Sequence, residues 1–282
     1  MTLRHGLTLP IFGPLANPTV VAEVAAAAEQ AGYDGVFVWD HVLYRRDPDG
    51  MDPHGRADVP VADPWVTLAA MAAATSKVAL GPMVTPLPRR RPQVLARQAT
   101  SMDVMSQGRL VLGVGLGGDG YGEFSAFDDE SDPRRRAAML DQRLALLDEF
   151  WSGDVVSSER DHAAAHDVRF LPTPVQRPRP PVWVAGRWPH AAPIRRAARW
   201  DGWFPIDLPG PDAVSEGLER IASQRGDLDD FDVVVNADPG ADPGPWGAAG
   251  ATWFLTSFSP WHVTASTVHD VIAAGPGWVA PA

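Results

Sequence analysis

Trp39, Asp40 and His41 form the tripeptide with the clearest capacity for chemistry in this sequence. They end the apolar run at residues 35–39, which is typical of a buried parallel strand. Side chains at the carboxyl end of a barrel strand face the mouth where active sites are built. An imidazole there exchanges a proton near neutral pH, and Asp40 can orient the imidazole or the loop backbone. We therefore predict His41 and Asp40 as catalytic residues; a strand-capping role for His41 is the open alternative.

A glycine-rich run extends from Gly113 to Gly118 with the spacing G-x-G-x-x-G. A dinucleotide-binding fold requires a helix to open at the third glycine, whereas here no helix is expected before Asp132. The run therefore predicts a strand that ends in small residues, so that a flat ligand lies close to the backbone.

A strand–glycine–helix junction runs from Trp183 to Pro189. Free N–H groups at a helix N-terminus suit a phosphate, and Arg187 beside Gly186 adds a bidentate charge. An ordinary strand–helix turn is the open alternative.

Other clusters are left outside the predicted site. Three arginines at residues 89–91 fit a solvated or salt-bridged face better than a phosphate grip. His162 and His166 have i, i+4 spacing without further ligands, and the sequence lacks H-E-x-x-H and G-x-S-x-G motifs, so we expect no metal site and no nucleophilic serine. The single lysine, Lys77, begins a strand away from the catalytic face, which disfavours an aldolase or hydrolase.

The elements that position these residues alternate between short apolar runs and helical segments, which predicts a parallel sheet with crossover helices. The expected strands are residues 4–9, 35–39, 78–85, 110–115, 181–185, 202–206, 231–236 and 251–256. The expected helices are residues 20–31, 63–75, 92–105, 132–151, 189–200, 212–224 and 263–273. Asn17, Asp63 and Asp132 each precede a proline, the pattern of a capped helix start.

Eight strands favour a closed (β/α)8 TIM barrel over a doubly wound sheet, which is the alternative. We expect one domain over residues 1–282, with a small hairpin insertion around 152–179. Only residues 243–250 separate the last two strands, which leaves room for one or two helical turns.

Composition narrows the class of protein. The chain of 282 residues is 45% hydrophobic and 21% charged, which suits a large core. Its net charge of -11 argues against nucleic-acid binding. No run approaches the roughly 18 apolar residues of a membrane span, and no signal-peptide core is evident, so we expect a cytoplasmic protein without membrane contact.

Several ordered motifs together resemble the luciferase-like monooxygenase family. They are Gly32-Tyr33-Asp34-Gly35 with Trp39-Asp40-His41, Leu80-Gly81 with Val84-Thr85-Pro86, residues 106–118, and Arg199-Trp200-Asp201-Gly202-Trp203 after Gly186-Arg187. The resemblance extends from Arg4 to about Pro205. It implies a luciferase-like TIM barrel whose mouth holds reduced FMN or coenzyme F420.

The resemblance also implies roles for individual residues. His41, with Asp40 beside it, lies next to the isoalloxazine or deazaflavin ring. Residues 82–85 form a bulge behind the ring, often with a cis peptide, for which Met83–Val84 is the favoured position. Gly186 and Arg187 match the phosphate-binding turn. The full set of implied cofactor contacts is Trp39, Met83, Val84, Thr85, Gly115, Leu116, Gly186, Arg187 and Trp188.

Two departures from the family pattern concern the mouth. Relatives that oxidise sugar phosphates carry an acid in the loop after strand four, where this chain has Leu116-Gly117-Gly118. The excursion after strand seven is reduced to residues 238–245, a shortened lid that leaves the pocket open.

The leading functional expectation is a monooxygenase that acts on a small organic substrate with reduced FMN and O2, supplied by a separate flavin reductase. The alternatives are an F420-dependent hydride-transfer oxidoreductase and a non-catalytic flavin-binding barrel. Trp39, Trp188, Trp203 and Phe204 predict an aromatic mouth for an apolar substrate or for the flavin itself. A homodimer is expected by analogy with the family.

Overall fold

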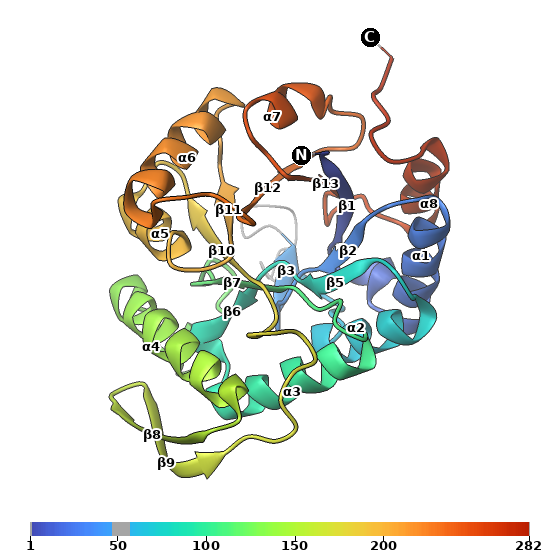
Figure 1. Ribbon diagram of the computed structural model, residues 1–282. Coiled ribbons are helices and arrows are strands. Elements are labelled where there is room, and N and C mark those ends of the chain that lie inside the picture. The colour runs from blue at the N-terminus through green and yellow to red at the C-terminus, as the bar shows by residue number, and fades with distance from the viewer. Residues whose placement is uncertain (1, 47–56, 282) are drawn as a thin grey trace.

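Parallel strands alternate with helices around a central axis (Figure 1). The computed structural model describes residues 2–46 and 57–281. The strands of the main sheet are β1 (Arg4–Leu9), β2 (Gly35–Val38), β5 (Ala79–Pro82), β6 (Thr85–Pro86), β7 (Leu112–Gly115), β10 (Val182–Arg187), β11 (Gly202–Ile206), β12 (Asp232–Ala237) and β13 (Trp253–Ser257). The surrounding helices are α1 (Pro18–Gln30), α2 (Pro64–Ala74), α3 (Pro92–Met105), α4 (Pro133–Ser152), α5 (Ala191–Ala197), α6 (Asp212–Arg225), α7 (Gly244–Ala248) and α8 (Ala265–Ala274).

The sheet closes into a barrel. Its strand order is β5-β2-β1-β13-β12-β11-β10-β7-β6, and the pairs in this sheet are parallel. β5, at one end of this order, meets the residues just before β7: Leu80 accepts a 2.9 Å hydrogen bond from the Val111 N–H and donates one of 3.0 Å to the Arg109 carbonyl. This closure confirms the predicted TIM barrel and excludes the open, doubly wound alternative.

The third expected strand, residues 78–85, is divided. β5 and β6 are its two parts, and Met83 and Val84 lie between them. The Met83–Val84 peptide bond is cis, at the position that the family resemblance favours. The sheet therefore has nine segments where the sequence predicted eight continuous strands.

The helix starts follow the capping signals. The side chains of Asn17, Asp63 and Asp132 each accept a backbone N–H from the first turn of α1, α2 and α4, and a proline follows each of them. α5 is shorter than the predicted 189–200, because it begins only after Pro189 and His190.

Large side chains fill the barrel. Along β2, Phe37 belongs to the interior cluster while its neighbours Val36 and Val38 pack in the helix layer, as alternation along a strand requires. Phe37, Trp183 and Trp253 lie against one another, with ring centroids 5.3 to 5.8 Å apart. A filled interior leaves only the ends of the barrel for a ligand, and the loops of the carboxyl ends are the longer ones.

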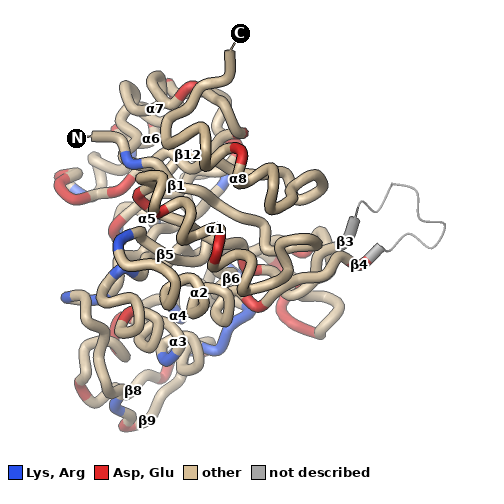
Figure 2. The backbone as a smooth tube through the Cα atoms, turned by 90° about the vertical axis from the view of Figure 1, so that its right-hand side faces the viewer, with Lys and Arg blue, Asp and Glu red and all other residues tan. Residues whose placement is uncertain are grey.

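Two hairpins extend from the barrel. β8 (Val155–Arg160) and β9 (Ala163–Arg169) confirm the predicted insertion and lie beyond α3 and α4 (Figures 1 and 2). β3 (Tyr44–Arg46) pairs antiparallel with β4 (Ala57–Val59), two strands that are not among those expected from the sequence. α7 is the single short helix expected between the last two strands. None of the described helices is long and apolar enough to cross a membrane.

Gly81 provides a test of barrel closure. A Cβ atom at this position would overlap the carbonyl oxygen of Val111, where β5 approaches β7. Gly81→Ala should therefore lower the free energy of unfolding by about 3 kcal/mol, measured by urea denaturation. Gly118→Ala is the matched control, because a Cβ there meets nothing within 4 Å. Equal stability of the two variants would contradict this closure.

Candidate functional site

The segment that follows β2 carries the residues with the densest polar contacts at the mouth. Asp40 is 1% exposed and is reached by two arginines from the segment after β6. Its Oδ2 accepts from Arg90 Nε and its Oδ1 from Arg90 Nη2, both at 2.7 Å. Arg89 Nη2 adds a 2.9 Å bond to Oδ1 and a 3.0 Å bond to the Asp40 carbonyl. Thr85 Oγ1 donates at 2.8 Å.

The charge on Asp40 is stabilised by these donors. Burial alone would raise the pKa of its carboxyl group, but the Arg90 hydrogen bond and charge, followed by Arg89 and Thr85, outweigh burial and hold the pKa below its ordinary value. The contacts of Asp40 fix the two arginines and the strand end. Their geometry favours a positioning role over the predicted catalytic one.

Glu123 connects the arginines to the imidazole. Its side chain is 3% exposed and comes from the loop between β7 and α4. Oε1 accepts from Arg89 Nη1 at 2.7 Å and from the Val42 N–H at 2.9 Å, and Oε2 lies 2.7 Å from His41 Nδ1. Burial acts to raise the pKa of Glu123, but the hydrogen bond with His41, together with Arg89 and Val42, lowers it below its ordinary value.

His41 is thereby held in one orientation. An ionised carboxylate only accepts hydrogen bonds, so Nδ1 of His41 carries the hydrogen that Glu123 accepts. Nε2 is left for a ligand, and the side chain remains 26% exposed. The arrangement matches a base and its orienting group, because the imidazole offers one nitrogen while the other is fixed.

Aromatic rings surround the imidazole. The ring centroids of Phe12, Trp39 and Tyr44 lie 5.4, 6.1 and 5.3 Å from that of His41. Trp39, predicted as a cofactor contact, is half-buried and donates through Nε1 to Thr8 Oγ1 at 3.2 Å. Thr8 lies near the carboxyl end of β1, so this bond fixes the indole at the mouth.

The glycines of β7 make room for the bulge in the divided third strand. A Cβ on Gly113 would overlap the Pro82 carbonyl, and a Cβ on Gly115 would lie 2.9 Å from Val84 Cγ2. The predicted contact of Gly115 with a cofactor stays a prediction. Val84 is half-buried and presents an apolar surface.

Met83 and Thr85 flank Val84 in the bulge. Met83 is 5% exposed and belongs to the interior cluster, and Thr85 is fully buried, with its hydroxyl directed to Asp40. Their predicted roles as cofactor contacts remain predictions, and in this geometry both support the residues that reach the mouth. Leu116 is half-buried just beyond the end of β7, with its predicted contact likewise untested.

The turn after β10 lies on the same rim but is organised differently from the prediction. A Cβ on Gly186 would overlap Pro193, so this glycine lets α5 pack closely against the strand. Arg187 is exposed and forms an ion pair with Asp207. Trp188 packs against Trp203 and under Arg220 of α6, on the helix side of the barrel, and its predicted contact with a cofactor stays a prediction. The phosphate-binding role of Gly186 and Arg187 stays a prediction.

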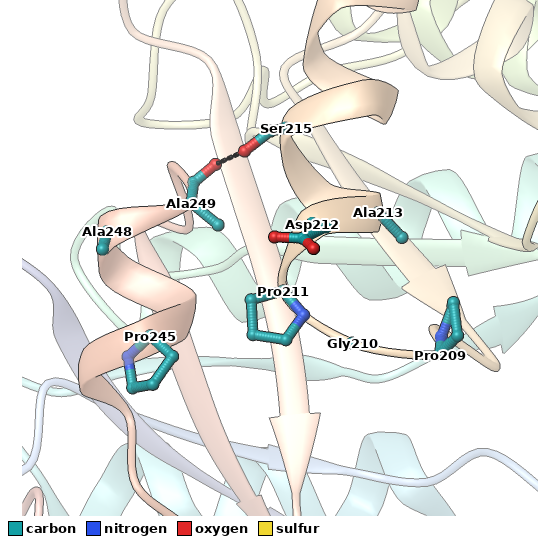
Figure 3. Close-up of a pocket in the computed structure, with 9 residues that line it drawn as sticks. All are labelled: Pro209, Gly210, Pro211, Asp212, Ala213, Ser215, Pro245, Ala248 and Ala249. Carbon is teal, nitrogen blue, oxygen red and sulfur yellow. Dashed lines mark hydrogen bonds between the residues drawn. The ribbon is translucent and has the colours of Figure 1, made fainter.

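A separate hollow lies outside the mouth. It has a volume of about 520 Å³ and is bounded by residues at the start of α6 and by α7, with Asp212 and Ser215 among the polar groups (Figure 3). Its walls include neither His41 nor Glu123, so this hollow is separate from the candidate site.

Sequence reasoning missed three members of the charged group. Arg89 and Arg90 were assigned to a solvated or salt-bridged face, and they do form salt bridges, but their shared partner Asp40 belongs to the predicted site. Glu123 lies ten residues after Gly113, in the loop after the fourth strand. That loop therefore does carry a carboxylate at the mouth, contrary to the departure that was expected at Leu116-Gly117-Gly118. The only sequence signal for Glu123 was a carboxylate shortly after a glycine-rich strand end.

Comparison with known proteins adds independent information. A model of the luciferase-like monooxygenase family matches residues 6–243. The F420-dependent glucose-6-phosphate dehydrogenase of Kineococcus radiotolerans is 30% identical over 264 residues, which cover 90% of this chain and 74% of that protein. The F420-dependent hydroxymycolic acid dehydrogenase of Mycobacterium tuberculosis is 32% identical over 182 residues, or 64% of this chain and 47% of that protein.

Among solved structures, an F420-dependent secondary alcohol dehydrogenase in complex with an F420-acetone adduct superposes with a TM-score of 0.78. The match covers 96% of this chain and 97% of that chain at 18% sequence identity. At this identity the likeness shows a shared fold.

The buried carboxylate of Asp40 gives a prediction about stability. Asp40→Asn leaves Arg90 without its counter-ion and removes one of the two carboxylates that pair with Arg89, so it should lower the free energy of unfolding at neutral pH by about 3–5 kcal/mol. Because the folded pKa of Asp40 is depressed, its contribution is fully present above the ordinary carboxyl pKa of about 4 and is lost as pH falls toward the lower folded value.

Denaturant unfolding across this pH range measures the effect. The stability gap between wild type and Asp40→Asn should narrow on acidification. A variant as stable as wild type at neutral pH, or a gap that widens in acid, would contradict the role assigned to Asp40.

Proposed function

The chain belongs to the luciferase-like monooxygenase family, and we propose that it is an F420-dependent oxidoreductase that transfers a hydride between the deazaflavin and the carbon of a small alcohol or carbonyl compound. The observation that carries this proposal is the His41–Glu123 pair at the mouth. It provides a proton acceptor of fixed tautomer next to the place where the barrel can hold a planar ring.

The residues at the mouth fit such a ring. Val84 and Ile206 are half-buried and cover the interior cluster, with Ala185 between them in the same cluster. These side chains form an apolar surface at the base of the mouth, and Trp39 lies beside it. Val84, Ile206 and Trp39 would hold the ring, and Arg187 on the rim is a candidate for the phosphate.

The choice of F420 over FMN rests on the relatives. Proteins about 30% identical to this chain are described as F420-dependent dehydrogenases that act on a sugar phosphate or a hydroxymycolic acid. Their names support hydride transfer over the reduced-FMN monooxygenase that the sequence analysis placed first.

In the proposed reaction F420 supplies, when bound, a ring carbon that accepts or gives a hydride. Nε2 of His41 takes the hydroxyl proton of the alcohol, or returns it to the carbonyl oxygen in the reverse direction. Glu123 holds Nδ1–H and stabilises the imidazolium that forms. Arg89 and Arg90 keep the carboxylates ionised, so the pair begins each turnover in the same state.

Cofactor titration tests the proposal first. Purified protein should quench the fluorescence of F420 with a Kd on the order of micromolar, and FMN should bind at least about tenfold more weakly. Tighter binding of FMN than of F420 would contradict the choice of cofactor. Binding of neither at micromolar concentration would overturn the function.

Replacement of His41 tests the proton acceptor. His41→Ala should lower kcat by about 10² to 10⁴, with F420 affinity retained, because a positioned base contributes about that factor. The matched control is His166→Ala. His166 is exposed on β9, in the hairpin outside the barrel, and is not part of the mouth. Unchanged kcat in His41→Ala, measured by F420 absorbance with saturating alcohol, would refute this role.

A further inference from the structure

Further aromatic rings, in contact with Tyr44, extend the group around His41 toward the solvent. Tyr44 lies with its ring centroid 4.4 Å from that of Tyr121 and 5.1 Å from that of Trp261. Tyr121 comes from the loop after β7 and Trp261 from the loop after β13. Phe12, from the loop after β1, stacks on Tyr44 at 4.3 Å. Loops from distant parts of the chain thus converge on one apolar wall.

The exposure of these rings divides them into support and surface. Phe12 is fully buried and Tyr44 is 5% exposed, so they support the wall. Trp39, Tyr121 and Trp261 are half-buried and present ring area at the mouth. Half-exposed rings of this kind bind an apolar or aromatic body, because each buries a large area at little entropic cost.

The polar atoms of the wall are neutral. Tyr121 donates its hydroxyl to the Tyr44 hydroxyl at 3.2 Å. Burial first, and then this hydrogen bond and the charge of Glu123, raise the pKa of Tyr44, so its phenol stays protonated at neutral pH.

The loops that supply Tyr121 and Trp261 offer no lysine or arginine to an anion. Arg89 and Arg90 already pair with Asp40 and Glu123. The loop after β7, residues 116–132, contains carboxylates and neither lysine nor arginine. Residues 226–282, which supply the loops after β12 and β13, also contain neither. Barrels commonly bind phosphate through the loops of these last two strands, and here a phosphate ester would meet no lysine or arginine from them.

From the aromatic wall and these charges we infer that the substrate is a neutral alcohol or ketone with an aromatic or aliphatic ring, and not a sugar phosphate. This inference rests on the proposed F420-dependent function. In the oxidative direction the C–H bond gives its hydride to oxidised F420, the O–H proton goes to Nε2 of His41, and the C=O bond forms. The alcohol is oxidised by two electrons and the deazaflavin is reduced by two.

A substrate panel tests the inference. The full-length protein with saturating F420 is given 1-phenylethanol, propan-2-ol, glucose or glucose 6-phosphate, and loss of F420 absorbance is followed. The kcat/KM for 1-phenylethanol should exceed that for propan-2-ol by at least about tenfold, because the ring gains a pocket contact. Glucose and glucose 6-phosphate should give no rate above background. A higher kcat/KM for glucose 6-phosphate than for 1-phenylethanol would overturn the inference.

A variant at the wall separates substrate recognition from the reaction. Trp261→Ala should raise KM for 1-phenylethanol by at least about tenfold, with F420 affinity and KM for propan-2-ol little changed. Trp278→Ala is the control, because Trp278 is 39% exposed in the segment after α8. Unchanged KM for 1-phenylethanol in Trp261→Ala would contradict the wall as the substrate site.

Failure of this inference is distinguishable from failure of the proposed function. If F420 binds and glucose 6-phosphate is oxidised, the function stands and the substrate class is wrong. If F420 does not bind, calorimetry of the protein alone with 1-phenylethanol and with glucose 6-phosphate still decides which ligand the wall accepts. Preferential binding of 1-phenylethanol would support the inference, and preferential binding of glucose 6-phosphate, or binding of neither, would overturn it.

Discussion

A buried set of charges at the mouth of the barrel determines how the candidate site is built. Asp40, Arg89, Arg90 and Glu123 together carry two positive and two negative charges, and their hydrogen bonds join the loops after β2, β6 and β7. Buried charges are costly to desolvate, so such a group persists only when each member is well paired. Here the pairing ends at the imidazole of His41, the member with an exposed edge. The ion pairs and hydrogen bonds within the group offset the cost of burial. They also leave the polar atoms of the site little freedom to move.

The barrel itself makes room for this group through small residues on neighbouring strands. Gly81, Gly113 and Gly115 let the divided third strand approach β7, and the bulge at Met83–Val84 places Thr85 beneath Asp40. The glycines in the sequence therefore permit closure of the sheet, and closure in turn brings the polar residues of the mouth together. A substitution at any of these glycines would alter the site by shifting the backbone that positions it. Such an effect needs no contact between the substituted residue and a ligand.

Most of the fold could be predicted because its signals are local. Capping residues such as Asn17 and Asp63, and apolar runs such as residues 35–39, act within a few positions of the chain. The division of the third strand was partly foreseen, since the resemblance pointed to Met83–Val84. The hairpin of β3 and β4 was not, because a polar segment rich in aspartate, proline and glycine has no strand periodicity.

The site was harder to predict, because its contacts join residues that lie far apart in the chain. His41 could be placed at the mouth from its strand alone, whereas its partner Glu123 lies 82 positions away in the chain and meets it only after closure of the barrel. Trp188 was placed at the mouth because it follows a strand, yet its side chain turns toward the helices. Position along a strand predicts the rim, and only the fold decides which way each side chain points.

The tautomer of His41 is the most direct test of how this site works. In protein labelled with ¹⁵N-histidine, NMR correlations from the ring protons distinguish the protonated nitrogen from the bare one, and a His41→Gln sample identifies the signal among the 8 histidines. In the neutral imidazole the hydrogen should reside on Nδ1, with Nε2 bare. A hydrogen on Nε2 with Nδ1 bare would contradict the pairing with an ionised Glu123, and with it the base proposed for the reaction.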